Sequence, residues 1–365
     1  AENPADGNFR VIYHPDEIHP RNHFSRESAE YVTNFFSAAF GTPEGFDYIE
    51  EDSQMWPVKE FFNFVGMVGF FMLLLPLTDV LLKTSFFKSL KGEPQEPKEL
   101  SGWKRYVQFF ATGGLITLLA GFLIRYFYID AFGWGTNFFP TTEHFPQPTS
   151  NPVIVWASGI GVLSLVIFLI GHYLVGKKEG DTPAKVLSIT PRNLGKTILM
   201  TFTIVGGLYL ALFIIHGLFT TDFRIWTFDI RTFEVEKVAT IIRYSVLLAF
   251  FFTINAFIIA NSRFNNLPEW ATTAIMAAFN VFGIVLVMLI QYITFFQTGA
   301  LWQWDMNLGY IVLFPIVPIL ILAAIFARQL YLRTGNVWLA GFVNALLFGA
   351  IMIANTATNF NYILF

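Results

Sequence analysis

The sequence predicts an α-helical polytopic membrane protein with a short polar segment before its first span. Of its 365 residues, 54% are hydrophobic and only 13% are charged, whereas an average soluble domain carries about 25% charged residues. Apolar stretches that approach the ~20 helical residues needed to cross a hydrocarbon core recur along the chain. They lack the short alternating pattern of barrel strands. Because backbone groups in lipid must be paired within a segment, these stretches favour a helical bundle.

Eight stretches are long enough to span a bilayer. The spans are expected at Val58–Lys83, Val107–Ile129, Pro152–Val175, Thr197–Thr220, Val238–Ala260, Trp270–Phe296, Leu308–Phe326 and Val337–Asn359. Pro315 and Pro318 are expected to bend or break the seventh. The chain therefore divides into a segment 1–41, a linker 42–57 and an eight-helix transmembrane domain 58–365.

The loops on the two sides of the predicted bundle differ in positive charge. One side carries Lys83, Lys88, Lys91, Lys98, Lys104, Arg105, Lys177, Lys178, Lys185, Arg192, Lys196, Arg263, Arg328 and Arg333. The other carries only Arg224, Arg231, Lys237 and Arg243. Because cytoplasmic loops hold the excess of Lys and Arg, we expect a multi-pass plasma-membrane protein. Loops 83–105 and 177–196 would be cytoplasmic and both termini extracellular.

Polar residues inside the spans are candidates for function, because they are costly in lipid. The ionisable ones lie near span ends: Asp79, Arg125, His172 and His216. The deeper ones are amides, which are expected to hydrogen-bond between helices: Asn255, Asn280, Gln291, Asn344 and Asn355. Without a clearly central carboxylate or histidine, the pattern favours structural roles over a transport pathway or a lipid or substrate pocket. The outer segment 221–237, which alternates polar and apolar residues, is expected to lie at the membrane surface as a loop, short strand or short helix.

Composition excludes several other functions. The net charge of −3 offers no basic face for nucleic acid, and the absence of cysteine excludes disulfides, thiolate metal sites and cysteine nucleophiles. No cofactor is predicted. The start, AENPADGNFR, lacks the basic and apolar regions of a signal peptide. If residues 1–57 are extracellular, the chain is expected to begin partway through a longer gene product.

Residues 8–41 show three elements in order. NFRVIY (8–13) is typical of a short strand, and HPDEIHPRNHF, with two prolines, predicts a loop. Ser25 is a good N-cap for a helix that Gly41 would end. Apolar residues recur at helical spacing in that helix: Val32, Phe35, Phe36, Ala39 and Phe40. So short a segment cannot fold alone, so the stripe needs a partner.

This order resembles the last strand, histidine loop and last helix of an α/β-hydrolase. The chain is also similar to a bacterial group in which an extracellular α/β-hydrolase domain precedes a polytopic membrane domain. The resemblance is carried by IHPRNHFSRESAEYVTNFFSAAFG, GFDYIEEDSQMWPVKEFFNFVGMVGFFMLLLP and KTSFFKSLKG. It implies a membrane-anchored serine hydrolase acting on an ester, lipid-derived or peptide substrate.

The chain departs from that family in one large respect. No G-x-S-x-G nucleophile motif occurs, and the strands that would carry the nucleophile and the acid are missing. Alone, the chain is expected to be inactive as a hydrolase. Its expected partners are the lipid bilayer and an upstream hydrolase segment, or a separate chain, that packs on residues 8–41.

The resemblance implies a catalytic histidine in the loop. His19 is favoured, because it stands 16 residues before Phe35 and the family's base lies at a similar separation; His23 stands 12 residues before it. His14 is the third choice. Two other interpretations remain: a zinc trio of His14, His19 and His23, whose spacing does not match a helical pair, and ordinary surface histidines. The alternatives to the hydrolase as a whole are a multi-helix transporter and a membrane scaffold subunit without activity of its own.

Overall fold

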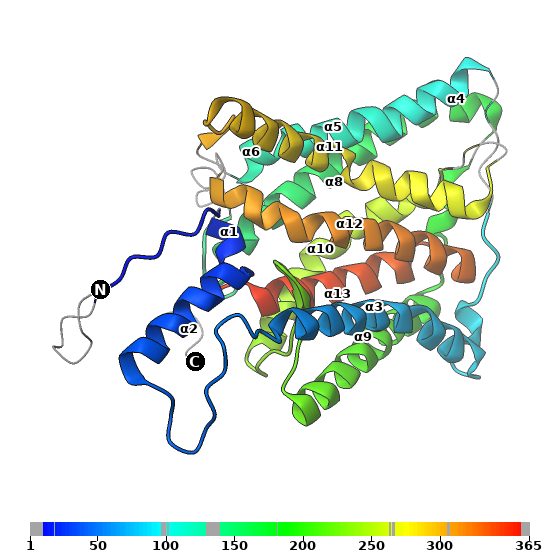
Figure 1. The fold of residues 1–365 in the computed structure, drawn as a ribbon. Helices are drawn as coiled ribbons and strands as arrows, with labels where there is room; N and C mark the ends of the chain where they lie inside the picture. The colour runs from blue at the N-terminus through cyan, green and yellow to red at the C-terminus, as the bar shows by residue number, and fades with distance from the viewer. Residues whose placement is uncertain are drawn as a thin grey trace.

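The computed structural model describes residues 10–17, 19–95, 100, 102–128, 139–180, 182–262, 264, 267–304 and 307–358. Within them the protein is mainly helical, and seven helices are long and apolar enough to cross a membrane. These are α3 (Trp56–Lys83), α8 (Ser150–Leu174), α9 (Pro191–Phe219), α10 (Lys237–Ala260), α11 (Glu269–Thr298), α12 (Asn307–Thr334) and α13 (Trp338–Asn355). Figure 1 shows them as one bundle whose helices run between the same two ends. The protein is thus suited to a bilayer as a multi-pass helical protein.

The second predicted span, Val107–Ile129, is not one continuous helix, so the expectation of eight uninterrupted spans is wrong over the described residues. It is built from α4 (Trp103–Gln108), a π-helical segment (Phe109–Leu115), α5 (Ile116–Phe122) and α6 (Ile124–Tyr128). In Figure 1 these pieces still run from the end where α3 finishes to the end where α8 begins. The chain therefore alternates between the two ends of the bundle, as the sequence predicted.

Glycines explain why this segment is broken. Gly121 on α5 and Gly283 on α11 meet backbone to backbone, and a Cβ on either would overlap the other helix. Thr117 Oγ1 accepts a hydrogen bond from the Gly283 N–H at 2.9 Å. A Cβ on Gly113 would overlap the ring of Phe279. Each glycine in a helix interior costs about 1 kcal/mol relative to alanine, so a regular helix is less favoured in this segment. The close contacts of Gly113 and Gly121 hold the segment against α11.

The seventh predicted span is unbroken. α12 continues through Pro315 and Pro318 without interruption, so the expected break is absent. Proline removes one backbone hydrogen bond in a helix interior, and neighbouring helices in a bundle can support the helix at such a point. α12 accordingly packs against α10, α11 and α13.

The centre of the bundle is α13. About 72% of its apolar stretch is buried, compared with 33% for α3 at the periphery. α13 packs against α9, α10 and α12. Its Gly341 and Gly349 lie so close to α10 that a Cβ on them would overlap Thr253 and Ser245. Small residues allow helices to approach closely where no hydrophobic effect drives them together.

A two-stranded antiparallel hairpin connects α9 to α10 and consists of β1 (Phe223–Ile225) and β2 (Phe228–Ile230). The short-strand alternative for segment 221–237 is thereby confirmed. Phe228 stacks on Phe71 of α3 with ring centroids 6.0 Å apart. Asn355 Nδ2, at the end of α13, donates to the carbonyl oxygen of Asp229 at 2.7 Å. The hairpin therefore closes one end of the bundle.

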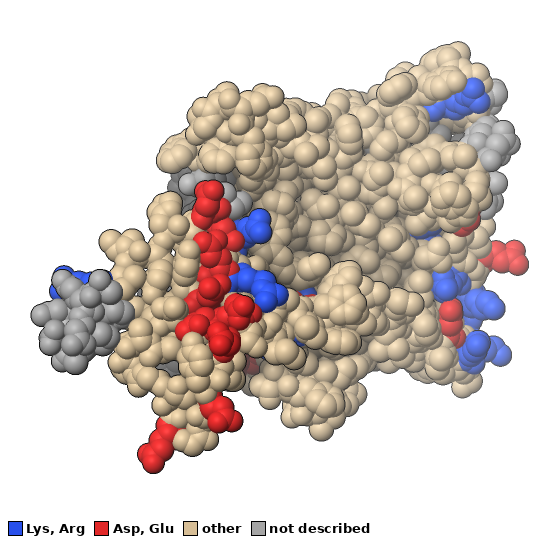
Figure 2. All heavy atoms as spheres, in the orientation of Figure 1, with Lys and Arg blue, Asp and Glu red and all other residues tan. Residues whose placement is uncertain are grey.

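Charged side chains lie at the two ends of the bundle rather than along its middle. On the face shown in Figure 2, Asp and Glu gather beside α2 with a few Lys and Arg next to them, and further Lys and Arg gather at the opposite end, where α3 finishes. A broad band between them carries almost no charge on this face. Large apolar side chains such as Phe61, Met72 and Phe213 are exposed around the bundle. This is the surface expected of a protein whose middle faces lipid.

Residues 10–13 form no strand, although the sequence predicted one over 8–13; residues 8 and 9 lie outside the described residues. A strand requires a neighbour to receive its backbone hydrogen bonds. Within the described residues the hairpin is the sheet that forms, so nothing here offers residues 10–13 an edge.

The predicted helix after the histidine loop is confirmed. Within the predicted loop, however, His19–Asn22 form a short helix, α1. The loop prediction is wrong there, because a proline such as Pro20 is tolerated in the first turn of a helix. α2 (Arg26–Phe40) follows. Ser25 caps α2 by accepting a hydrogen bond from the Ser28 N–H at 3.0 Å. Gly41 ends it with φ of 70°, a conformation that glycine adopts without strain.

The contact between α5 and α11 gives a first prediction. Gly283→Ala should lower the free energy of unfolding by about 1–3 kcal/mol, the usual cost of overpacking, because its Cβ would meet the backbone of Thr117. Gly206→Ala on α9 is the matched control, since a Cβ there meets nothing within 4 Å. Thermal unfolding of the purified protein in detergent measures both. Equal midpoints would show that the two helices do not meet at Gly283.

Candidate functional site

The structure places the three histidines on one short stretch of chain. His14 is exposed in the extended segment, His19 is the first residue of α1, and His23 is exposed in the turn before α2. The side chain of His19 lies outside the described residues, so the choice of His19 over His23 stays a prediction. Among the described residues, no three His, Asp or Glu side chains gather as a metal-binding group; the zinc alternative includes His19 and likewise stays a hypothesis.

The helix after the histidines presents an apolar face that the bundle does not cover. No residue of α2 is buried. The exposed fractions of Val32, Phe36 and Phe40 are 57%, 54% and 80%, and the rings of Phe36 and Phe40 stack at 6.0 Å. Contiguous apolar surface of this kind marks a site of interaction with another molecule or segment.

Hydrogen bonds hold α2 beside the start of α3. Gln54 Nε2 donates to the carbonyl oxygen of Arg26 at 2.8 Å, and Arg26 Nη2 donates to that of Asp52 at 3.1 Å. Before the histidine turn, the rings of Tyr13 and Tyr31 stack with centroids 4.7 Å apart. The extended segment, the histidine turn and α2 are therefore connected to one another and to the linker that leads into the bundle.

Asp79, one of the ionisable residues within the spans, and two arginines of α12 take part in ion pairs at the basic end. Arg333 donates two hydrogen bonds to the carboxylate of Asp79, at 2.7 and 3.3 Å, which joins α12 to α3. Arg328, only 1% exposed, makes the same bidentate contact with Glu269 of α11 at 2.6 and 2.8 Å. Bidentate pairs of this kind are strong and geometrically specific. Asp79 is thus explained by helix packing and needs no transport role.

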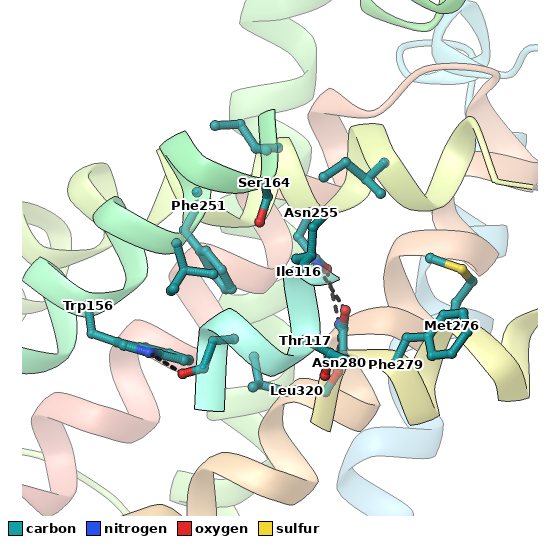
Figure 3. Close-up of a pocket in the computed structure, with 15 residues that line it drawn as sticks. Ile116, Thr117, Trp156, Ser164, Phe251, Asn255, Met276, Phe279, Asn280 and Leu320 are labelled. Carbon is teal, nitrogen blue, oxygen red and sulfur yellow. Dashed lines mark hydrogen bonds between the residues drawn. The ribbon is translucent and has the colours of Figure 1, made fainter. Parts of the chain in front are cut away.

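Three of the five deeper amides join neighbouring helices, as the sequence predicted, whereas Gln291 bonds to a loop and Asn355 to the hairpin. Asn255 and Asn280 exchange hydrogen bonds at 2.9 and 3.3 Å, and Asn280 also donates to the Leu320 carbonyl. Figure 3 shows the two side chains directed at each other across the pocket between α10 and α11. On α13, fully buried Asn344 donates to the Ala323 carbonyl of α12 at 2.9 Å. These contacts satisfy polar groups that lipid would leave unpaired.

The pocket in Figure 3, here called the amide pocket, lies among α5, α8, α10, α11 and α12. It contains about 580 Å³ of empty space, its opening included. Three of its polar side chains are hydrogen-bonded to protein: the amide pair described above, and Trp156, whose Nε1 donates to the Ala120 carbonyl at 3.0 Å. The partners of these three side chains indicate a structural network, and Ser164 adds a hydroxyl to the lining.

A second cavity lies directly beneath the hairpin and is here called the hairpin cavity. It contains about 830 Å³ of empty space, mouth included, and is lined by β2 and by helices α8, α10, α12 and α13. Trp156, Phe251 and Leu320 line both cavities, so the two adjoin. At the hairpin end the lining is polar, with Thr149, Asp229 and others; the remainder is aromatic and aliphatic.

Two polar atoms of the hairpin cavity lack partners. Among the described residues, Asp229 Oδ1 and Thr149 Oγ1 are buried atoms that make no hydrogen bond. Burial raises the pKa of Asp229 to about 6; nearby Asp222 raises it further, and Arg231 and Arg224 oppose the shift. An unpartnered buried polar atom costs about 1–3 kcal/mol. The fold therefore keeps Asp229 at the expense of stability.

Sequence reasoning missed this cavity. Its only signal was the alternation in segment 221–237, which indicated a surface strand but not that Asp229 would face the bundle. The positions of the lining residues along the chain do not show how five separate elements converge.

The arginine of the Arg328–Glu269 pair is more deeply buried than that of the Arg333–Asp79 pair. The two pairs should therefore contribute differently to the free energy of unfolding. Glu269→Ala should lower the free energy of unfolding by about 3 kcal/mol, because it leaves the guanidinium of Arg328 buried without its carboxylate. Asp79→Ala should cost no more than about 1 kcal/mol, because the Arg333 and Asp79 side chains are 25% and 45% exposed. Thermal unfolding of the two variants side by side measures the difference, and an equal loss would contradict it.

The pKa of Asp229 gives a pH-dependent prediction. The folded-state pKa of Asp229, about 6, lies above the ordinary value of 3.8, so the fold disfavours the ionised form. Stability contributed by this group is therefore lost as pH rises from about 4 to about 6. Asp229→Asn should unfold at a higher temperature than the parent protein above pH 6, with the gain vanishing near pH 4. A gain that is independent of pH would refute this explanation.

Comparison with known proteins adds no family to this description. No protein-family model matches the chain, and no curated protein or solved structure matches it either. The hydrolase resemblance therefore stays a hypothesis, carried by residues 18–41, 45–76 and 83–92.

Proposed function

We propose that this chain is the membrane-embedded part of a membrane-anchored serine α/β-hydrolase. The observation that carries the proposal is α2: a capped helix preceded by a histidine turn, held at one end of the bundle, with an apolar face that the bundle leaves exposed. An upstream hydrolase segment, or a separate hydrolase chain, would pack on that face. It would also give residues 10–13 the strand edge that they lack in the described structure.

The chemistry assigned to the turn is general base catalysis. His19, or His23 as the second choice, would take the proton of a serine nucleophile and return it to the leaving group. The nucleophile and the orienting carboxylate would come from the partner segment. The substrate class is an ester, a lipid-derived molecule or a peptide.

The distribution of charge supports an orientation for this enzyme. Lys and Arg gather at the end of the bundle away from α2 on the face shown in Figure 2, and cytoplasmic loops carry such an excess. The plasma membrane would then hold α2, the hairpin and both termini outside, with loops 83–105 and 177–196 inside; Lys98 and Arg263 of the basic set lie outside the described residues. The catalytic domain would face the cell exterior.

The exposed face of α2 also fits a scaffold subunit that completes a domain of another chain. A transporter has less support, because in the described residues Asp79 is paired with Arg333 and the two asparagines of the amide pocket are partnered. The test below separates the hydrolase from both.

The test uses the native protein isolated from its membrane. Intact mass and N-terminal sequencing establish what chain accompanies residues 1–365, and a fluorophosphonate probe for active serines should label the preparation. His19→Ala should abolish labelling more completely than His23→Ala, because the base must activate the nucleophile. Asn22→Ala, in the same turn, is the control and should leave labelling unchanged.

A second pair of variants tests the partner face. Phe36→Asp should reduce labelling by disturbing the packed apolar face, whereas Asn34→Asp, which adds the same charge elsewhere on α2, should not. If the native preparation contains no serine that the probe labels, the hydrolase proposal fails. If His19→Ala and His23→Ala reduce labelling equally, the assignment of His19 as the base is wrong.

A further inference from the structure

Of the two adjoining cavities, only one has the properties of a ligand site. In the amide pocket the two asparagines and Trp156 bond to each other or to backbone carbonyls. In the hairpin cavity, within the described residues, a carboxylate oxygen and a hydroxyl oxygen are buried without partners. Buried polar atoms in folded proteins are nearly always paired. Asp229 and Thr149, which carry these atoms, line the hairpin cavity, so a bound molecule that reaches the two oxygens would supply the missing partners.

The lining is arranged by polarity along the length of the cavity. Thr149 and Asp229 lie at the hairpin end, while Phe251, Ile319 and Phe348 belong to helix segments deeper in the bundle. The hairpin cavity contains about 830 Å³ of empty space, its open mouth included. A ligand that matches this lining has one polar end and one hydrocarbon end.

The charges around Asp229 restrict which chemical group the polar end of the ligand can carry. Asp229 lies opposite Arg224 across the hairpin, but Arg224 is already paired with Glu60 at 3.0 Å. Asp222 adds negative charge nearby, and Arg231 adds positive charge. An anionic head would be repelled by the Asp229 carboxylate, whereas a hydroxyl or an amine would donate a hydrogen bond to it.

We propose that the hairpin cavity binds a single-chain lipid whose head donates hydrogen bonds to Asp229 and Thr149 and whose hydrocarbon chain lies among α8, α10, α12 and α13. Because Trp156, Phe251 and Leu320 line both cavities, the end of the lipid's hydrocarbon chain can approach the amide pocket. Asn355 holds the hairpin over the head by its 2.7 Å hydrogen bond to the backbone of Asp229. This site does not depend on the hydrolase proposed above, because none of its residues belongs to segment 1–57.

The test is photo-crosslinking of the purified full chain in detergent with a monoacylglycerol that carries a diazirine in its acyl chain. Crosslinks should map by mass spectrometry to peptides of α8, α10, α12 or α13 that line the cavity. Unlabelled monoacylglycerol and a long-chain alkylamine should compete, and whichever competes better identifies the head as hydroxyl or amine. A fatty acid anion at pH 8 should not compete.

Two variants and a control locate the binding. Asp229→Asn, which keeps the size of the side chain, should weaken competition by about tenfold, the value of one hydrogen bond to a charged group. Ala157→Leu, which adds bulk to a lining residue that is 3% exposed, should abolish the crosslinks. Val246→Leu adds bulk on a side chain of α10 that is 67% exposed and should change nothing.

Three results would overturn the proposal. They are crosslinks that map outside the hairpin cavity, competition by the anion equal to that of the monoacylglycerol, and binding that neither variant reduces. Elution profile and thermal midpoint check that each variant is folded. If Ala157→Leu fails to fold, the isosteric Asp229→Asn decides alone, and unchanged affinity in that variant rejects the site.

Discussion

The close approach of α10 and α13 is the contact on which the rest of the bundle depends. Gly341 and Gly349 bring α13 against Thr253 and Ser245 of α10 with no room for a side chain. From that position α13 also packs on α9 and α12, and the end of α13 holds the hairpin through Asn355. In lipid, such packing replaces the hydrophobic effect as the force that holds helices together.

A second constraint follows from the same surroundings: polar groups inside the bundle need partners within the protein. Asn255, Asn280 and Asn344 find them on neighbouring helices, and Arg328 finds Glu269. Asp229 Oδ1 is one of several buried side-chain atoms among the described residues that make no hydrogen bond, and, with Thr149 Oγ1, it belongs to a residue that lines the hairpin cavity. Proteins keep costly groups of this kind where function requires them, which is why the hairpin cavity, rather than the better-paired amide pocket, carries the proposed lipid site.

The two proposals concern the same end of the molecule but different surfaces. α2 and the histidine turn lie beside the start of α3 and present an apolar face outward. The hairpin cavity opens into the bundle from beneath β2. A membrane-anchored hydrolase would gain from a lipid site near its catalytic domain, because an amphiphilic substrate or product could reach it from the bilayer. Each proposal has its own test, so either can fail without the other.

The sequence by itself determined the helical spans, because about 20 consecutive apolar residues have no other stable arrangement across a bilayer. It also determined the capped helix from Ser25 to Gly41 and the amides that join helices, since these depend on local hydrogen bonding and depth. Only the tertiary structure decided that Val107–Ile129 is broken, because that depends on Gly283 lying against it from α11. Likewise, the cavity at Asp229 forms where β2 and four helices converge. No local pattern encodes such a convergence, because it arises from packing between residues far apart in the chain.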